Sequence, residues 1–308
     1  MRAVMVAPAL DAPVVIGLDV GGTKILSGLV DRDGTILADH EVPSPDRSEE
    51  GVLAALDEAV EALLDDRVAA IGYGIPANLE RRTGRILNAM NLPLDDVDLV
   101  ARSKVRFGLP VGIENDGGAA ALAEWRRGAG RGTTNLLMLT LGTGVGGGVV
   151  VDERLFRGWA ELGHIVVQEG GAECTCGGHG HLEVLASGTA GDRVAQELFG
   201  PEADAQALIE RATAGDGDAR EALARIGGSL GAAVGSLVNI FDPELVVVGG
   251  GFGAAAGDLV LEPAREAARA EAVPPARDTV RIVPAELGSE AGLVGAGLVA
   301  FEALDGER

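Results

Sequence analysis

Cysteine, lysine and long apolar runs are scarce in this 308-residue sequence. Two cysteines cannot form a disulfide framework, which favours a reducing compartment, and we expect a cytoplasmic protein. Lysine occurs only as Lys24 and Lys104, and the net charge of −22 argues against binding to nucleic acid or an anionic membrane surface. No apolar run reaches the roughly 18–20 residues of a membrane span, and residues 1–13 form a short tail without a signal-peptide core.

Glycine is abundant, with 47 residues, and we expect it mainly at turns between apolar strands. The expected strands are 14–20, 25–30, one from 35, 68–75, 111–114, one from 135, 244–248 and 279–284. The expected helices are 49–64 with Ser48 as N-cap, 97–107, 118–127, 182–199, 203–213, 217–241, one after 251 and one from 290. This alternation of strands and helices predicts an α/β fold.

The opening pattern of strand, glycine turn and strand comes back at Asn135. Shifted by 121 positions (142 − 21), Gly21 falls on Gly142 and Asp31 falls on Asp152. The repeat indicates an internal duplication of a β-hairpin with a glycine-rich tip, and therefore two related α/β halves.

The two glycine turns, Gly21-Gly22-Thr23-Lys24 and Gly142-Thr143-Gly144, have two interpretations. Converging backbone N–H groups in such turns can bind a polyphosphate, with Lys24 as a cation and Asp19 holding magnesium through water. Alternatively, the turns are ordinary hairpin tips, Lys24 is a surface residue and Asp19 caps its turn.

Both cysteines and three of the four histidines lie in one segment, as His164, Cys174, Cys176, His179 and His181. Such ligands suggest zinc, which takes four Cys or His ligands in a structural site. Reduced thiols in a glycine-rich loop, or a strained disulfide, are the alternatives. The carboxylates that bracket the segment, Glu161 and Glu183, suggest a second function on the same scaffold, although isolated glutamates are commonly solvated.

A set of motifs gives the chain a family resemblance. They are D-V-G-G-T-K (19–24), E-N-D (114–116), L-G-T-G-V-G-G-G (141–148), E-L-G-H (161–164), C-G-G-H-G-H-L-E (176–183), Ser187-Gly188 and Asp242-Pro243-Glu244. In this order, over about residues 14–300, they resemble the ROK family of sugar kinases and sugar-responsive repressors.

The resemblance implies the actin-like ATPase (ribonuclease H-like) fold, with two duplicated α/β domains and a cleft where sugar and ATP meet. The domains would be 14–116 and 117–308, with a zinc loop at 161–183 and a terminal helix that packs back on the first domain. The ATP-binding positions would be Gly21, Gly22, Thr23, Lys24, Gly142, Thr143, Gly144, Gly249, Gly250 and Gly251.

The resemblance also assigns residues to the sugar. Asp116 would be the general base on the sugar hydroxyl, although an aspartate just before a helix is more commonly an N-cap. The sugar-binding positions would be Asn91, Asn115, Asp116, Glu161, His164 and Glu183.

The zinc positions of the family match His164, Cys174, Cys176 and His181, where the family has cysteine at the last position. Histidine is a competent ligand, so we expect a Cys2His2 zinc site; loss of zinc is the alternative. His179 would face solvent, because 181 keeps the family register. Smaller departures from the family pattern are Ala77, where the family often has glycine, and Gly117-Gly118 after the aspartate; these could loosen the sugar pocket.

The expected function is ATP- and Mg2+-dependent phosphorylation of a hexose, with glucose as the first choice and a homodimer as the usual state of the family. Other acceptors are mannose, fructose, N-acetylglucosamine and N-acetylmannosamine. A non-catalytic sugar sensor is the alternative class. A DNA-binding repressor is disfavoured, because the first glycine motif begins at Asp19 and the pI is about 4.5.

Overall fold

The computed structural model describes residues 12–43, 48–89 and 92–306. The chain forms two compact units, each with its own five-stranded sheet and hydrophobic core. One unit runs to Ala119 and resumes at Gly292, and the other comprises Ala120–Ala291. The expected domain boundary was after Asp116. The first unit also includes residues 117–119 and the C-terminal helix.

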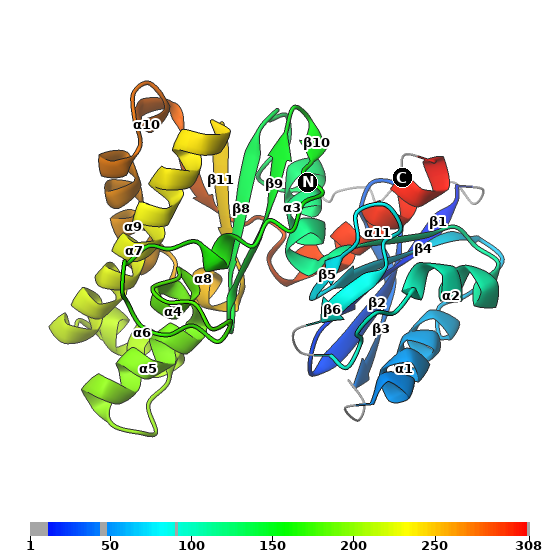
Figure 1. Cartoon of the computed structure of the whole chain (residues 1–308), viewed down its shortest axis with the longest axis horizontal. Coiled ribbons are helices and arrows are strands. Elements are labelled where there is room, and N and C mark those ends of the chain that lie inside the picture. The colour runs from blue at the N-terminus through cyan, green and yellow to red at the C-terminus, as the bar shows by residue number, and fades with distance from the viewer. Residues whose placement is uncertain (1–11, 44–47, 90–91, 307–308) are drawn as a thin grey trace, which may run out of the picture. The chain divides into compact units, whose positions relative to one another are not determined.

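The sheet of the first unit has the strand order β3-β2-β1-β4-β7 (Figure 1). Its strands are β1 (Val14–Val20), β2 (Lys24–Val30), β3 (Ile36–Pro43), β4 (Val68–Ile75) and β7 (Val111–Asn115), with a separate hairpin of β5 (Ala77–Leu79) and β6 (Ile86–Ala89). Its helices are α1 (Glu49–Glu61), α2 (Leu99–Phe107), α11 (Ala291–Asp305) and the start of α3 (Asp116–Arg127). Sequence analysis missed β5 and β6, because these short strands carry mostly polar or half-exposed residues.

The sheet of the second unit has the order β10-β9-β8-β11-β12 (Figure 1). Its strands are β8 (Leu136–Leu141), β9 (Val145–Val151), β10 (Arg154–Leu155), β11 (Leu245–Gly249) and β12 (Arg281–Pro284). Its helices are α4 (Glu183–Ala186), α5 (Gly188–Phe199), α6 (Ala205–Ala214), α7 (Gly217–Phe241), α8 (Gly251–Ala256), α9 (Asp258–Glu271), α10 (Ala276–Thr279), η1 (Leu162–His164) and η2 (Gly288–Glu290).

The two sheets confirm the predicted duplication. In each, the first strand pairs antiparallel with the second, at β1–β2 and β8–β9, and parallel with a later strand, at β1–β4 and β8–β11. The pairs that follow in each sheet, β4–β7 and β11–β12, are also parallel, whereas β2–β3 and β9–β10 at the other edge are antiparallel. The glycine turns at 21 and 142 therefore occupy equivalent positions in the two sheets.

Two expected helices are broken in the structure. The helix expected over 182–199 stops before Ser187, whose extended backbone lets its side chain accept a hydrogen bond from Ala190 N and start α5. The helix expected after 251 breaks at Gly257, whose φ of 52° and ψ of −133° suit glycine. Both expectations of one continuous helix were wrong, because a cap and a glycine interrupt the apolar periodicity.

Four glycines form a row across the sheet of the first unit, within strands rather than at turns. Gly28, Gly17, Gly72 and Gly112 are partners in register on β2, β1, β4 and β7. The helix α11 lies on this row (Figure 1). A Cβ on Gly17 would lie 2.7 Å from Leu293 O, and one on Gly72 would collide with Ala296 O. The glycines therefore let the helix backbone rest directly on the sheet.

A similar close contact joins α7 and α9 in the second unit. Gly227, Gly231 and Gly235 recur every fourth residue, and a Cβ on any of them would collide with the backbone or side chains of α9. Within the described residues, α7 is one helix with the length and hydropathy of a membrane span, but 56% of that window is buried in the protein. Its small-residue face accounts for that burial, as expected of a core helix.

Replacing Gly72 with Ala should lower the free energy of unfolding by about 1–3 kcal/mol, because the new methyl group would overlap the carbonyl of Ala296. Urea denaturation measures this loss. Gly74→Ala on the same strand is the control, since its nearest neighbour is the Ala119 methyl at 3.3 Å. Equal losses in both variants would contradict direct seating of α11 on the sheet.

Candidate active site and metal centre

Asn115 and Asp116 stand where β7 ends and α3 begins. Asn115 Oδ1 accepts hydrogen bonds from Gly117 N at 2.9 Å and Gly118 N at 3.3 Å, which makes Asn115 the N-cap. Its Nδ2 donates to Ala77 O at 3.3 Å. The capping role considered for Asp116 is therefore filled largely by the preceding residue.

The Asp116 carboxylate lies in the first turn of α3. Burial raises its pKa above the usual value, and the hydrogen bond that Oδ1 accepts from Gly117 N at 2.8 Å opposes this rise. A half-buried carboxylate with a raised pKa at a helix start is a stronger proton acceptor than a solvated aspartate. These properties suit a general base.

Asp19 is a neighbouring carboxylate in the same unit. Burial first, and then the charge of Asp116, raise the pKa of Asp19 to about 6, against the lowering effect of Lys24. The carboxylate rests on the first turn of α11, because a Cβ on Gly292 would lie 2.5 Å from Asp19 Oδ2. The helix packed on the glycine row thus also fixes a candidate cation ligand.

Lys24 takes a different role in the structure from the one expected. Its Nζ lies 2.7 Å from Glu41 Oε2 on the neighbouring strand β3, and both side chains are more than half exposed. Such an exposed pair contributes little to stability, so it can open to receive an anion. The adjoining turn is closed by Gly21 N, which donates to Lys24 O at 2.9 Å.

The expected nucleotide glycines of the second unit meet at one end of its sheet. Gly249 is paired with Thr140, so β11 and β8 end side by side. Gly250 has a φ of 82°, and a Cβ there would collide with the backbone of Leu141. Gly188 N donates to Gly142 O at 2.7 Å, which brings the start of α5 to the same turn. The predicted turn and the 249–251 segment are therefore neighbours.

The four predicted zinc ligands gather in the second unit. The side-chain donor atoms of His164, Cys174, Cys176 and His181 all lie within 4.8 Å of one another. Cys174 Sγ is 3.6 Å from His164 Nδ1, and Cys176 Sγ is 3.2 Å from His181 Nδ1. We call these four residues the His/Cys cluster. Both thiols are free, so the disulfide alternative does not hold in this structure.

The cluster fits a tetrahedral zinc ion. Bonds of about 2.0–2.3 Å place tetrahedral ligand atoms roughly 3.3–3.8 Å apart, so the widest separation needs to shrink by only about 1 Å. Burial raises the pKa of the Cys174 thiol, and a bound cation would favour the thiolate.

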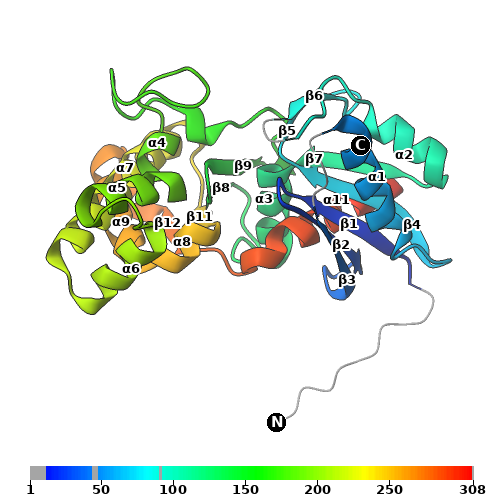
Figure 2. The same cartoon turned by 90° about the horizontal axis from the view of Figure 1, so that it is seen from below.

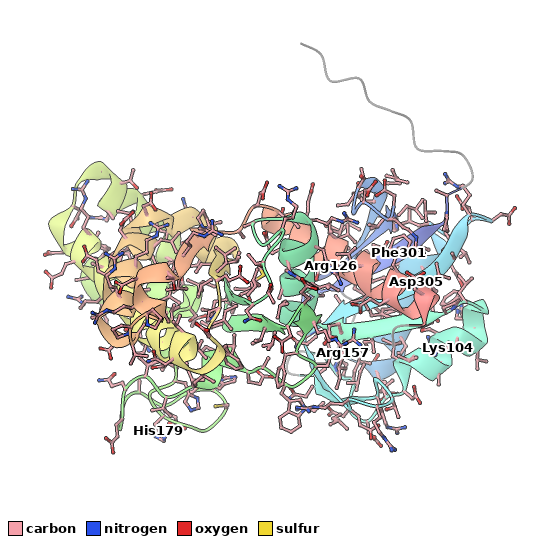
Figure 3. The ribbon with its side chains drawn as sticks, turned by 90° about the horizontal axis from the view of Figure 1, so that it is seen from above. Lys104, Arg126, Arg157, His179, Phe301 and Asp305 are labelled. Carbon is pink, nitrogen blue, oxygen red and sulfur yellow. The ribbon has the colours of Figure 1, made fainter. Side chains whose placement is uncertain are left out.

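His179 lies outside the cluster. It is exposed at the outer edge of the loop beside α4 (Figures 2 and 3), opposite Glu173 in a short antiparallel bridge. His181 instead pairs with Val166 and points its ring over Gly178, where a Cβ would collide with the imidazole. The glycine at 178 therefore gives His181 the room to turn towards the cysteines.

The E-L-G-H segment forms the short helix η1 with Glu161 at its start. Gly163 packs on the backbone of Val145, where a Cβ would collide with the carbonyl oxygen. The preceding Ala160 has a φ of 48°, a conformation that favours glycine. The backbone of Ala160 is therefore strained. Glu161 follows it at the surface, three residues before the candidate ligand His164.

Glu183 contacts both the cluster loop and the glycine turn. Its Oε2 accepts a hydrogen bond from Val145 N at 3.0 Å, and its Oε1 lies 3.4 Å from Thr175 Oγ1 and 3.8 Å from Cys174 Sγ. Sequence analysis missed the partners Val145 and Thr175, because a backbone amide and a loop hydroxyl carry no recognisable motif.

The structure thus brings Asn115, Asp116 and Asp19 together in the first unit, and the cluster and Glu183 together in the second, where Glu161 precedes the cluster residue His164 by three positions. Asn91, the remaining predicted sugar contact, lies outside the described residues.

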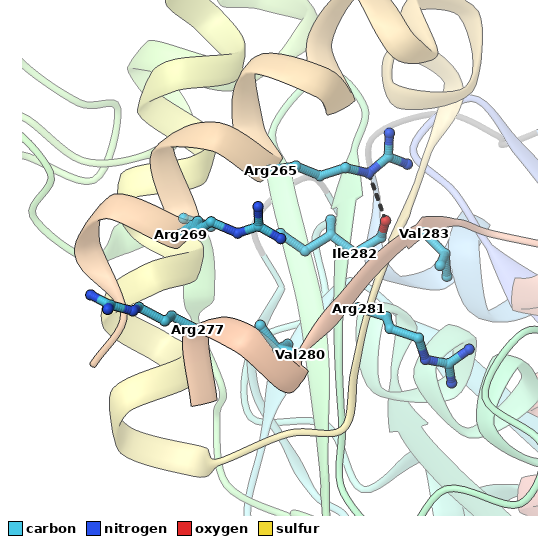
Figure 4. Close-up of a pocket in the computed structure, with 8 residues that line it drawn as sticks. Arg265, Arg269, Arg277, Val280, Arg281, Ile282 and Val283 are labelled. Carbon is cyan, nitrogen blue, oxygen red and sulfur yellow. Dashed lines mark hydrogen bonds between the residues drawn. The ribbon is translucent and has the colours of Figure 1, made fainter. Parts of the chain in front are cut away.

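A cavity of about 300 Å3 lies elsewhere in the second unit, between α9, α10 and β12. Four arginines contribute to its lining, but Arg265 is paired with Asp258 and Glu262. Figure 4 shows Arg265 and Arg269 extending towards Ile282, whereas Arg277 and Arg281 extend away from each other. Within the described part of the chain, none of the predicted site residues lines this cavity.

Comparisons with known proteins agree with this geometry. The model of the ROK family matches residues 15–303. A glucokinase of Streptomyces coelicolor is 36% identical over 321 residues, which cover 94% of this chain and 98% of that protein. The structure of a ROK family glucokinase from Streptomyces griseus in complex with glucose and AMPPNP is 35% identical with a TM-score of 0.80, covering 94% of this chain and 99% of that one.

A ROK hexokinase from Thermus thermophilus is 38% identical, with a TM-score of 0.84 and coverage of 95% and 99%. These likenesses confirm the predicted actin-like fold class.

The purified protein should contain about one zinc ion per chain, as a Cys2His2 site requires. His181→Ala should lower the zinc content measured by elemental analysis, because it removes one of four ligands. His179→Ala is the matched control on the same loop and should retain the metal. Greater zinc loss from the His179 variant would show that the other histidine is the ligand.

Proposed function

This chain belongs to the ROK family, and we propose that it is an ATP-dependent hexose kinase whose preferred acceptor is glucose. The observation that carries the proposal is Asp116, a half-buried carboxylate with a raised pKa, held at the start of α3 next to its capping Asn115. The glucose and AMPPNP bound to the Streptomyces griseus relative support the choice of both substrates.

In the proposed reaction, Asp116 accepts the proton of the sugar's primary hydroxyl group. The hydroxyl oxygen then attacks the γ-phosphorus of ATP, the bond from that phosphorus to the bridging oxygen breaks, and ADP leaves. Catalysis of this kind depends mainly on positioning and on stabilising the charge of the phosphoryl oxygens. The raised pKa makes Asp116 a stronger proton acceptor than a solvated aspartate.

We expect the sugar to be oriented by Glu161, His164, Glu183, Asn115 and Asn91. Asn115 Oδ1 already accepts two backbone hydrogen bonds, so we expect this residue to contribute a donor, the second N–H of its amide. Glu161 is exposed at the start of η1, where its carboxylate could accept hydrogen bonds from sugar hydroxyls.

The ATP phosphates would be bound by the backbone N–H groups of the turns at Gly21–Thr23 and Gly142–Gly144, with Gly249–Gly251 beside the second turn. Asp19 would hold Mg2+, which neutralises phosphate charge when bound. The His/Cys cluster would hold a structural zinc ion, and its role is to fix the loop that carries His164 and leads to Glu183. We further propose a cytoplasmic homodimer.

Asp116→Asn should lower kcat by about 10²–10⁴-fold, as expected for loss of a general base, while glucose binding persists. ADP formation and calorimetry measure the two effects separately. Asparagine keeps the size of the side chain, so a folding defect is not expected. A variant that retains normal turnover would remove Asp116 as the base.

The kcat/KM of the wild-type enzyme should fall as the pH is lowered, because Asp116 must be ionised to accept a proton. Burial raises its pKa, so the midpoint should lie above the ordinary value of 3.8. Asp19, with a pKa of about 6, should also contribute to this acidic limb through loss of its charge. The pH profile of Asp19→Asn, measured with excess Mg2+, separates the contribution of Asp116 from that of Asp19. A rate that stays constant down to pH 4 would contradict the assignment.

A panel of hexoses and N-acetylhexosamines with Mg-ATP should give the highest kcat/KM for glucose. Asp116→Asn serves as the blank for background ATP hydrolysis. Preference for mannose, fructose, N-acetylglucosamine or N-acetylmannosamine would retain the kinase and change its acceptor. Binding of one sugar by calorimetry without any ADP formation would favour a non-catalytic sensor.

A further inference from the structure

His181, the last predicted zinc ligand in the sequence, precedes Glu183 by two residues, and the Glu183 side chain reaches the glycine turn between β8 and β9. After His181, Leu182 N donates to Ile165 O at 3.0 Å, and Glu183 begins α4. The backbone bridge between Val166 and His181 closes the same loop. The position of His181 therefore determines where the Glu183 side chain starts.

The Glu183 carboxylate reaches the turn itself. Oε2 accepts the N–H of Val145, the residue that follows Gly144. A Cβ on Gly144 would collide with this carboxylate, so glycine is needed for the contact. The carboxylate thereby holds a backbone group at the start of β9, directly after the turn that we assign to phosphate binding.

The other carboxylate oxygen faces the cluster loop. Oε1 lies 3.4 Å from the hydroxyl of Thr175, which stands between the two cysteine ligands. Ligation of Cys174 and Cys176 would fix Thr175 on both sides. Glu183 is thus held by the metal loop from two directions, through the chain from His181 and through the Thr175 hydroxyl.

The turn is also contacted by the next helix of the chain, α5. Thr189 Oγ1 donates to Thr143 O at 2.7 Å, and Gly188 N donates to Gly142 O. Gly188 and Thr189 lie in the first turn of α5, a few residues after Glu183. The turn is therefore contacted both by Glu183 of α4 and by the start of α5.

We propose that Glu183 is a positioning residue that couples the His/Cys cluster to the glycine turn, so that metal binding orders the turn and strengthens binding of the phosphate donor. This inference rests on the proposed function only for the identity of the donor. The coupling between cluster and turn is a property of the second unit, and it holds whichever sugar is phosphorylated.

The test compares zinc-loaded protein with protein depleted by a chelator, using AMPPNP affinity by calorimetry. Metal removal should weaken AMPPNP binding by about five- to 150-fold, the usual range of coupling between two sites. Amide hydrogen exchange should rise in the peptide that covers residues 142–146. Unchanged affinity and unchanged exchange after metal loss would overturn the proposal.

Glu183→Gln should reproduce both effects while it keeps one zinc ion per chain, and chelation should then change AMPPNP affinity little further. Thr175→Val removes the hydroxyl contact, keeps both cysteines and should weaken the coupling partly. His179→Ala, on the exposed side of the loop, should behave as wild type. If chelation lowers the AMPPNP affinity of Glu183→Gln as much as it lowers that of the wild type, the metal affects the turn through residues other than Glu183.

The coupling and the kinase activity fail in different ways. If AMPPNP does not bind at all, the proposed ATP-dependent activity fails, and hydrogen exchange at 142–146 still decides the coupling. If ADP forms normally but amide hydrogen exchange at residues 142–146 is the same with and without the metal, the kinase activity is supported and the coupling is wrong. KM for ATP should rise more than kcat falls in Thr175→Val, which a general loss of folded protein would not produce.

Discussion

The first unit depends on the direct contact between α11 and a row of four glycines on its sheet. Because no side chain separates the two, α11 presents Gly292 to the Asp19 carboxylate. The same helix meets α3 closely, since a Cβ on Gly295 would collide with the Ala119 carbonyl. Asp19 and the start of the helix that carries Asp116 are thus placed by one packing contact. Residues distant in the sequence are therefore fixed together by the absence of side chains.

In the second unit, a single residue, Val145, receives contacts from two predicted motifs. Its N–H is bound by Glu183, and its carbonyl oxygen adjoins Gly163 of the E-L-G-H segment. Both motifs belong to the predicted zinc loop at 161–183. The Glu183 side chain and the E-L-G-H segment thus both contact Val145 at the start of β9, and this explains why glycine is needed at both 144 and 163.

The order of strands and helices, the duplication and the gathering of the His/Cys cluster could be predicted from periodicity and motifs. The glycines within strands could not, because glycine shows that something approaches closely without showing what approaches. Gly17 and Gly72 fall within the expected strands 14–20 and 68–75, but nothing in those strands indicates that α11 packs on them. The capping role considered for Asp116 was misplaced by one residue, since Asn115 and Asp116 are both good caps and only the backbone geometry distinguishes them.

If the chain binds ATP, as we propose, its acidic charge opposes the binding of the polyphosphate. With a net charge of −22 and two lysines, the chain cannot rely on a broad positive field, and Lys24 is already paired with Glu41. Backbone N–H groups supply positive partial charge that does not titrate and that no carboxylate side chain has to neutralise. Their weakness is that a glycine turn is intrinsically free to move. Contacts from Glu183 and Thr189 restrict this turn, so in the proposed function less of the nucleotide-binding energy would be spent on ordering it.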